Sequence, residues 1–277
     1  MSDNQKTLNS SIEFTGVGLH TGEDVHMVIE PAKINHGVKF QRIDLENQPT
    51  LPADINLVTD TQRSTTLEKD NVKIVTVEHL MSALYALGVN NVLIKLDRSE
   101  VPILDGSAKY FVEEIQKVGL KVQDAPLKYI DLPNPIHYTD PDSGSEILFV
   151  PANTFIISVV LDYQNHALGT QYAEIRDLKN YPTEIAPCKT FVFLTELEKL
   201  SKANLIKGGE LENAIVVVDR EDINPSEIKK LAHLLGKDDL DIQINGNILN
   251  NCEMQFHNEP ARHKLLDVIG DLALIGM

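Results

Sequence analysis

Three residues near the end of the chain have the types and spacing that metal chemistry requires. His263, Asp267 and Asp271 follow one another at intervals of four residues, so an α-helix would present all three on one face. The residues between them are largely apolar, which indicates a substantially buried helix, and a buried charge needs a partner or a metal. Spacing alone does not separate this interpretation from the commoner one, a solvated face with a minor ion pair.

A second helical pattern opens with Glu78 and His79. An acidic residue in the first turn is favoured by the helix dipole, so this pair is ordinary by itself. Together with His263 and Asp267 it supplies a standard ligand set for catalytic zinc, two His and one carboxylate, with a fourth position left for water. Glu78 would then take a proton from that water. The absence of an HExxH motif from the sequence disfavours a thermolysin-like protease, and a non-haem iron enzyme is the alternative for these ligand types.

A glycine-rich segment, residues 16–22 (GVGLHTG), lies between two strand patterns. It is not a dinucleotide-binding fingerprint, because position 21 is Thr and a strand rather than a helix follows. Two interpretations remain open. The segment is either an ordinary β-turn or a loop whose backbone approaches a ligand closely, with His20 facing that ligand.

The elements that must position these residues alternate along the chain. Alternating or β-branched runs predict strands at residues 11–14, 25–29, 38–42, 92–96, 128–131, 147–150 and 155–162. Helices are predicted at residues 76–87, 107–118, 194–205, 225–235 and 259–275, the first two with Thr76 and Ser107 as N-caps and the last with Asn258. Residues 123–126 are predicted to be a linker. The pattern predicts an α+β fold of two domains of similar plan, residues 1–125 and 126–277, each a sheet with helices.

The composition argues against some partners. The chain has 277 residues, of which 25 are basic and 41 acidic, and its formal net charge is −16. It therefore lacks the excess of cations with which proteins bind nucleic acid or anionic membranes. Its two cysteines, Cys188 and Cys252, lie far apart, which indicates reduced thiols. The polar opening residues and the absence of a long apolar run predict a soluble, cytoplasmic protein without a membrane span.

Six stretches of the sequence resemble the UDP-3-O-acyl-N-acetylglucosamine deacetylase family, the zinc amidases of lipid A biosynthesis. In family order they are residues 11–22 (SIEFTGVGLHTG), 76–87 (TVEHLMSALYAL), 101–108 (VPILDGSA), 189–193 (KTFVF), 208–214 (GGELENA) and 262–276 (RHKLLDVIGDLALIG). The resemblance implies a fold in which helices pack between the two sheets and the site lies at the domain junction. It also implies Zn²⁺ as the cofactor and a small UDP-linked acylated sugar as the substrate.

The resemblance assigns roles to individual residues. His79, His263 and Asp267 match the zinc ligands of the family, and Glu78 matches the general base. Thr190 matches the residue that helps to stabilise the oxyanion of the tetrahedral intermediate.

Further residues match family positions around the metal. Lys264 falls where family members contact the substrate and is suited to its anionic diphosphate, and Asp271 matches a carboxylate that orients a general-acid His. The remaining matches are predicted to contact substrate or to line the sugar and acyl-chain passage: His20, Phe191, Phe193 and Gly209.

The general-acid His of the family belongs to a Gly-His segment beyond the last helix, and this sequence ends at Met277. The resemblance therefore implies a C-terminally truncated member, expected to be monomeric, whose parent is of the kind fused to a hydroxyacyl dehydratase domain. Loss of a general acid typically slows hydrolysis by ~10²–10⁴-fold. A catalytically impaired fragment that still binds ligand is thus the alternative to an active enzyme.

Overall fold

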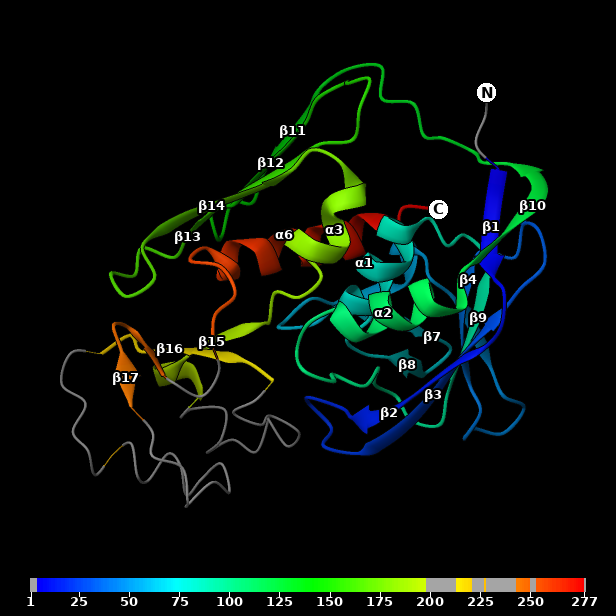
Figure 1. Cartoon of the computed structure of the whole chain (residues 1–277), viewed down its shortest axis with the longest axis horizontal. Coiled ribbons are helices and arrows are strands. Elements are labelled where there is room, and N and C mark those ends of the chain that lie inside the picture. Colours follow the sequence, from blue (N-terminus) through cyan, green and yellow to red (C-terminus); the bar gives the residue numbers. More distant parts are fainter. Residues whose placement is uncertain (1–3, 198–212, 221–226, 228–242, 250–252, 277) are drawn as a thin grey trace.

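The computed structural model describes residues 4–197, 213–220, 227, 243–249 and 253–276 (Figure 1). Gly209, the helix predicted at residues 225–235 and most of the helix predicted at residues 194–205 lie outside these described residues. The architecture is mixed α+β, as the strand and helix patterns predicted. Among the described residues, none of the helices is both long and apolar enough to cross a bilayer.

The largest sheet of the described chain is formed by its first hundred residues. Its five strands, in spatial order, are β2 (Ile12–Val17), β3 (Asp24–Pro31), β9 (Val92–Leu96), β4 (Val38–Arg42) and β5 (Thr50–Pro52). All neighbours are antiparallel except the parallel pair β4–β9. Alternate residues of β4 and β9 are buried, as expected for strands with one face on a core. Helix α2 (Lys109–Val118) packs on β2, where Phe111 meets Phe14 edge to face with ring centroids 5.0 Å apart.

The segment predicted to be a linker is a strand. Residues 123–126 belong to β10 (Leu120–Pro126), which pairs antiparallel with β1 (Asn4–Leu8). Gln123 explains the difference, because its side chain donates to the Ala32 carbonyl and accepts from Asn91 and so fixes the strand to its neighbours. The strand predicted at residues 128–131 does not form. A three-stranded sheet of β6 (Val58–Asp60), β7 (Thr66–Lys69) and β8 (Val72–Ile74) precedes helix α1 (Glu78–Leu87), and a short 3-10 helix, Ile55–Leu57, precedes β6.

The second half of the chain forms smaller sheets. Two antiparallel pairs come first, β11 (Ile136–Thr139) with β12 (Glu146–Phe149) and β13 (Ile157–Asp162) with β14 (Thr170–Ile175). A 3-10 turn, Leu178–Asn180, and helix α3 (Tyr181–Glu184) follow. A four-stranded sheet is then built in the order β15 (Phe191–Phe193), β16 (Ile215–Val217), β18 (Ile248–Leu249) and β17 (Ile244–Asn245).

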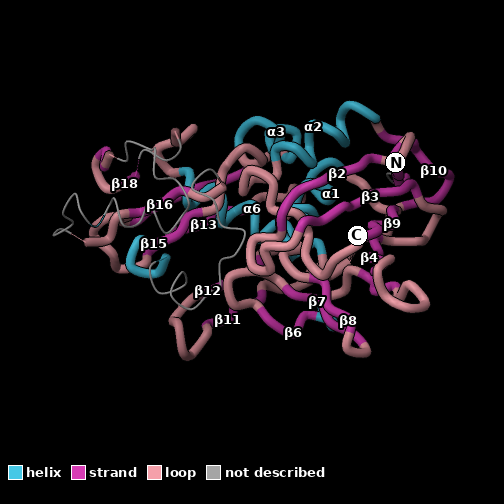
Figure 2. The backbone as a smooth tube through the Cα atoms, turned by 90° about the horizontal axis from the view of Figure 1, so that it is seen from below, coloured by secondary structure: helices cyan, strands magenta, loops and turns pink. Residues whose placement is uncertain are grey.

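Helix α6 (Glu259–Ala273) joins the two halves of the fold. It packs against α1 on one side and against β13 and β14 on the other, and one continuous core includes residues of all four elements. Figure 1 shows α6 running between the β13–β14 pair and α1, and Figure 2 shows the same helices from below. Gly270 permits the contact with α1, because a Cβ on Gly270 would lie only 2.0 Å from the Glu78 carbonyl oxygen.

The predicted starts of two helices need correction. Helix α1 begins at Glu78, not Thr76, because Thr76 has φ of 60° and its hydroxyl donates to Glu100 instead of capping the helix. Helix α2 begins at Lys109, although the Ser107 hydroxyl still accepts from the Lys109 amide at 3.1 Å. The last helix begins after Asn258, as predicted, and has proline in its first turn.

Candidate metal centre and active site

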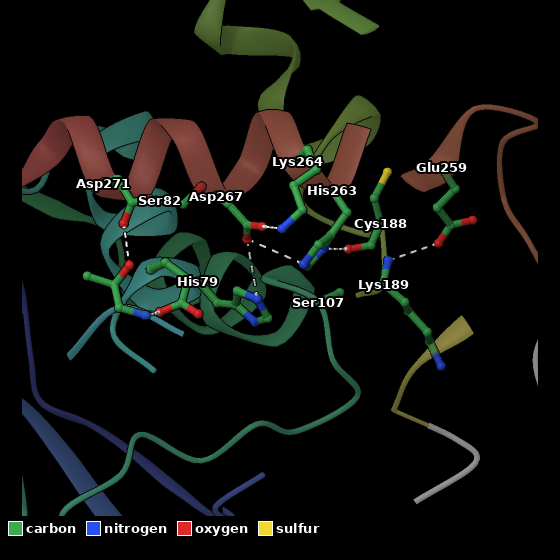
Figure 3. Close-up of polar contacts among 12 residues, drawn as sticks. His79, Ser82, Ser107, Cys188, Lys189, Glu259, His263, Lys264, Asp267 and Asp271 are labelled. Atoms are coloured by element: carbon green, nitrogen blue, oxygen red, sulfur yellow. Dashed lines mark hydrogen bonds and ion pairs between the residues drawn. The ribbon is translucent and has the colours of Figure 1, made fainter. Parts of the chain in front are cut away.

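The three residues predicted to bind metal lie together where α1 meets α6. Their ligand atoms, one nitrogen from each of His79 and His263 and one oxygen of Asp267, all lie within 4.8 Å of one another. Asp267 Oδ1 is 3.7 Å from His79 Nε2 and 3.4 Å from His263 Nε2, and the two imidazole rings stand edge to face at 4.9 Å (Figure 3). The i, i+4 spacing on α6 and the close approach at Gly270 together produce this cluster.

A hydrogen bond from its second ring nitrogen fixes the orientation of the His263 ring. Its Nδ1 lies 3.0 Å from the carbonyl oxygen of Cys188, so Nδ1 carries the hydrogen and Nε2 keeps its lone pair. A metal-binding His commonly has such an outer hydrogen bond, which sets both tautomer and orientation. Cys188 itself is buried, and burial raises the pKa of its thiol. Its structural contribution to the site is therefore the backbone carbonyl rather than the sulfur.

The charges in the cluster suit a cation. Burial lowers the pKa of His79 to about 3 and also lowers that of His263, so both imidazoles are neutral at pH 7. Burial by itself would raise the pKa of Asp267, but the pKa is lowered; with both imidazoles neutral, the Lys264 ammonium, which donates to Oδ2 at 2.9 Å, keeps this carboxylate ionised. Its Oδ1 is buried without a hydrogen-bond partner among the described residues. An orphaned carboxylate oxygen facing two neutral imidazoles is a donor set that fits a divalent metal such as zinc.

Glu78 lies beside the ligands and is held by a residue that sequence patterns did not indicate. The Thr65 amide donates to Glu78 Oε2 at 3.0 Å, and the Thr65 hydroxyl donates to Asp271 Oδ1 at 2.7 Å. Burial, followed by the charge of Asp267, raises the pKa of Glu78 to about 8. Burial likewise raises the pKa of Asp271, to about 6. Thr65 thus links the two carboxyl groups on either side of the α1–α6 contact.

Lys264 brings a positive charge to the edge of the cluster. Its Nζ donates to Asp267 Oδ2 at 2.9 Å and lies 5.9 Å from the centre of the Phe191 ring. The charge of Asp267 is the main reason that the pKa of Lys264 is raised, so this side chain is protonated at pH 7. Because its side chain remains 40% exposed, Lys264 can still meet an anionic ligand from solvent.

The segment with Thr190 and the two phenylalanines is anchored next to the cluster. Glu259, which is 1% exposed, accepts a hydrogen bond from the Lys189 amide at 2.9 Å. The Thr190 amide donates to the Gly106 carbonyl at 2.9 Å. Cys188 belongs to the same segment, and its carbonyl accepts from His263. The main chain at Thr190, two residues further on, therefore lies near the metal ligands.

An aromatic group extends from this segment. Phe191 and Phe193, the outer residues of β15, stand edge to face with Tyr163, at centroid distances of 5.9 and 5.3 Å. Phe191 and Phe193 are half-buried, and Tyr163 is exposed. With Lys264 over Phe191, they form a half-open apolar wall that continues from the cluster of charges.

His20 lies in the turn between β2 and β3. Its amide donates to the buried carboxylate of Glu100, which also accepts from the hydroxyl of Thr76, two residues before Glu78. His20 Nε2 is buried without a hydrogen-bond partner among the described residues. His20 is therefore connected to the start of α1 through Glu100 and Thr76.

Sequence reasoning missed four residues that hold the site. Thr65, Glu100 and Glu259 act through buried hydrogen bonds, and Cys188 acts through its carbonyl. Glu259 had a weak signal, since it is an acidic residue in the first turn of the helix that carries His263. The others have partners far away in the sequence, so no local pattern indicates them.

The geometry described here is that of mononuclear metal hydrolases, in which a carboxylate beside the ligands handles the proton of a water molecule. The comparison with known proteins agrees. The chain belongs to the UDP-3-O-acyl N-acetylglycosamine deacetylase family, whose model matches residues 5–232 and 236–277.

Individual relatives are similar over almost the whole chain. The bifunctional enzyme LpxC/FabZ of Bacteroides thetaiotaomicron is 47% identical over 98% of this chain, and that of Chlorobaculum tepidum is 42% identical over 99%. The chain spans 59% of the length of each of these two relatives. The UDP-3-O-acyl-N-acetylglucosamine deacetylase of Hahella chejuensis is 38% identical over 98% of this chain, which spans 82% of that relative.

Proposed function

We propose that this chain is the catalytic part of a zinc-dependent deacetylase of lipid A biosynthesis. It would hydrolyse the N-acetyl group of a UDP-3-O-acyl-N-acetylglucosamine and release acetate. The observation that carries the proposal is the buried cluster of His79, His263 and Asp267 beside Glu78, in a chain of the deacetylase family. An amide is a poor electrophile with a poor leaving group, which makes such a cluster necessary.

Zinc held by His79, His263 and Asp267 would supply a Lewis acid, which lowers the pKa of a bound water to about 7 and polarises the amide carbonyl. Glu78 takes the proton of the attacking water, and its position is fixed by the Thr65 amide. The Thr190 hydroxyl stabilises the developing oxyanion. Asp271, held by the Thr65 hydroxyl, orients the group that protonates the departing amine.

The rest of the substrate would lie along the neighbouring residues. Lys264 is suited to the diphosphate, because it is a secured cation with an exposed side chain. Phe191 and Phe193 offer an apolar wall for the sugar and acyl chain. His20 contributes a polar contact. Gly209 keeps its assignment to the same passage, from the family motif alone.

The proposal includes the setting of the enzyme. The proposed enzyme has two domains of similar plan, residues 1–125 and 126–277, and a cytoplasmic location. Its parent chain also carries a dehydratase activity. The double name of the Bacteroides thetaiotaomicron and Chlorobaculum tepidum relatives supports the last point. The net charge of −16 supports a small-molecule substrate over nucleic acid.

The test is acetate release from the UDP-linked acylated sugar by the purified protein, with and without a chelator. Glu78→Gln should retain the metal and lose about 10²–10⁴-fold in rate, because only the proton acceptor is removed. Activity that survives in Glu78→Gln would refute the assigned base. A protein that binds the sugar but releases no acetate would be the impaired binding fragment, and activity restored by iron but not zinc would favour the iron alternative.

A further inference from the structure

Glu100 is a buried carboxylate outside the cluster of metal ligands and proton-transfer groups. Its side chain is fully buried, with a relative exposure of 0%. A buried charge is costly unless it is paired or fully hydrogen-bonded. Its two oxygens accept hydrogen bonds from three residues of two separate segments. This position is therefore occupied by a charged group whose surroundings are built to hold it.

One of the two segments is the turn that carries His20. Glu100 Oε1 accepts from the His20 amide at 3.0 Å, and Oε2 accepts from both the amide and the hydroxyl of Thr21 at 2.9 Å. The absence of a side chain at Gly18 leaves room for the carboxylate, because a Cβ at that position would lie 2.5 Å from Glu100 Oε2. The turn therefore closes around the carboxylate, and the backbone at His20 is fixed by it.

The other segment is the connection between β8 and α1. Glu100 Oε1 also accepts from the Thr76 hydroxyl at 2.9 Å. Thr76 has φ of 60°, a conformation that a β-branched residue rarely adopts and that needs support from its surroundings. It turns the chain from β8 into the helix whose first two residues are Glu78 and His79. The carboxylate thus holds the residue that aims the start of α1.

We propose that Glu100 is a positioning residue for the deacetylation reaction, because its one buried carboxylate fixes both the His20 turn and the Thr76 bend that opens α1. Glu100 does not touch the reacting atoms. It keeps His20, whose Nε2 has no partner among the described residues, in register with Glu78 and His79. The reaction part of this inference rests on the proposed function, whereas the anchoring part can be tested without it.

Glu100→Gln is the informative variant. Each carboxylate oxygen accepts a backbone N–H, from His20 or from Thr21, and these donors cannot rotate away as hydroxyls can. Whichever way the Gln amide is oriented, its NH₂ group therefore faces a backbone N–H. The shape of the side chain is kept while one accepting group is lost.

Asn91→Asp is the matched control. Asn91 is also buried, at 1% exposure, and its side chain also links separate segments, donating to Gln5 and Gln123 and accepting from the Gly37 amide. It contributes to the β1–β10 region and is outside the proposed site. Both variants exchange nitrogen and oxygen within a buried hydrogen-bonded group, so both test the cost of disturbing the fold.

The measurements are hydrogen exchange of residues 18–22, zinc content and affinity, and kcat and KM for acetate release per mole of bound zinc. Glu100→Gln is expected to speed exchange of this turn about tenfold or more and to lower kcat/KM about 10- to 100-fold at full zinc occupancy. Asn91→Asp should lower thermal stability and leave exchange of residues 18–22 and kcat/KM per zinc within threefold of the parent, as a merely structural role predicts.

If Glu100→Gln does not fold, Thr21→Val removes one hydroxyl donor and should lower kcat/KM about 3- to 10-fold in a folded, zinc-loaded protein. The proposal is overturned if the folded Glu100→Gln protein keeps kcat/KM per zinc and the exchange of residues 18–22 within threefold of the parent. It is also overturned if Asn91→Asp changes both by the same factor. Absence of acetate release from the parent protein would refute the proposed function, while the exchange measurement would still decide whether Glu100 anchors the turn.

Discussion

Gly270→Ala tests whether the close crossing of α1 and α6 creates the metal site. The new Cβ would lie 2.0 Å from the Glu78 carbonyl oxygen and 2.8 Å from the carbonyl carbon. Both atoms belong to helix backbone and cannot move aside as a side chain can. To reach a tolerable contact of 3.0 Å, the helices must separate by about 1 Å in a core packed to crystal-like density.

Two opposing effects determine how much Gly270→Ala changes the free energy of unfolding. A Gly→Ala change within a helix ordinarily stabilises by about 0.5–1 kcal/mol. Overpacking a well-filled contact costs about 1–3 kcal/mol or more, so the net free energy of unfolding should fall. Metal–ligand distances tolerate only about ±0.2 Å, and a separation of about 1 Å moves His79 away from His263 and Asp267. Zinc affinity should therefore fall at least about 10- to 100-fold.

The assays are thermal or denaturant unfolding of the metal-free protein and zinc affinity by chelator competition. Gly16→Ala is the control, because its Cβ would meet only side chains, Pro102 Cβ at 3.1 Å and Leu104 Cδ2 at 3.3 Å. It should leave zinc affinity unchanged. A Gly270→Ala protein that is as stable as the parent, or more so, and binds zinc equally well would refute the close-crossing argument.

Three further outcomes are expected. Thr65→Val keeps the amide donor to Glu78 but removes the hydroxyl donor to Asp271, so kcat/KM should fall about tenfold with zinc content unchanged; an unaltered kcat/KM would count against a role for this link. Zinc binding at pH 7 should release a proton from Glu78, whose pKa is raised to about 8 and which a cation would ionise, and this release should fade as pH rises above 8. Calorimetry in buffers of different ionisation enthalpy measures it, and Glu78→Gln should release about one proton fewer. Lys264→Met should raise KM about tenfold or more without weakening zinc binding, since it removes a cation from beside a cation site; weaker zinc binding would contradict this.

The metal cluster could be predicted from the sequence because two of its residues form a local pattern and the third lies in a distinctive motif. The i, i+4 pair His263 and Asp267 shares one helix face, and the family motif supplied His79. The strands at residues 38–42 and 92–96 were predicted with their actual bounds, since alternation of buried residues is a local signal. Phe191 and Phe193 were assigned to the substrate passage from the resemblance alone, without a predicted strand, and the structure has them on β15 with Lys264 over the Phe191 ring.

The misses have a common physical cause. Thr76 has the sequence signature of an N-cap, but a hydrogen bond to Glu100, 24 residues away, holds it in a left-handed conformation. Residues 123–126 have a polar, linker-like composition, yet Gln123 forms hydrogen bonds with Asn91 and Ala32 and keeps the segment in a strand. Thr65 is ordinary in sequence and becomes important only when α6 brings Asp271 to it. Each depends on tertiary partners that a local pattern does not encode.

The most direct test of the central claim is a zinc titration of chelator-stripped protein, followed by acetate release from the UDP-linked acylated sugar. Release should begin near zero, rise in proportion to added zinc and level off at about one zinc per chain, the stoichiometry of a mononuclear site. His263→Ala should remain inactive across the same range. Full acetate release by the stripped protein, or a normal titration curve for His263→Ala, would contradict the account.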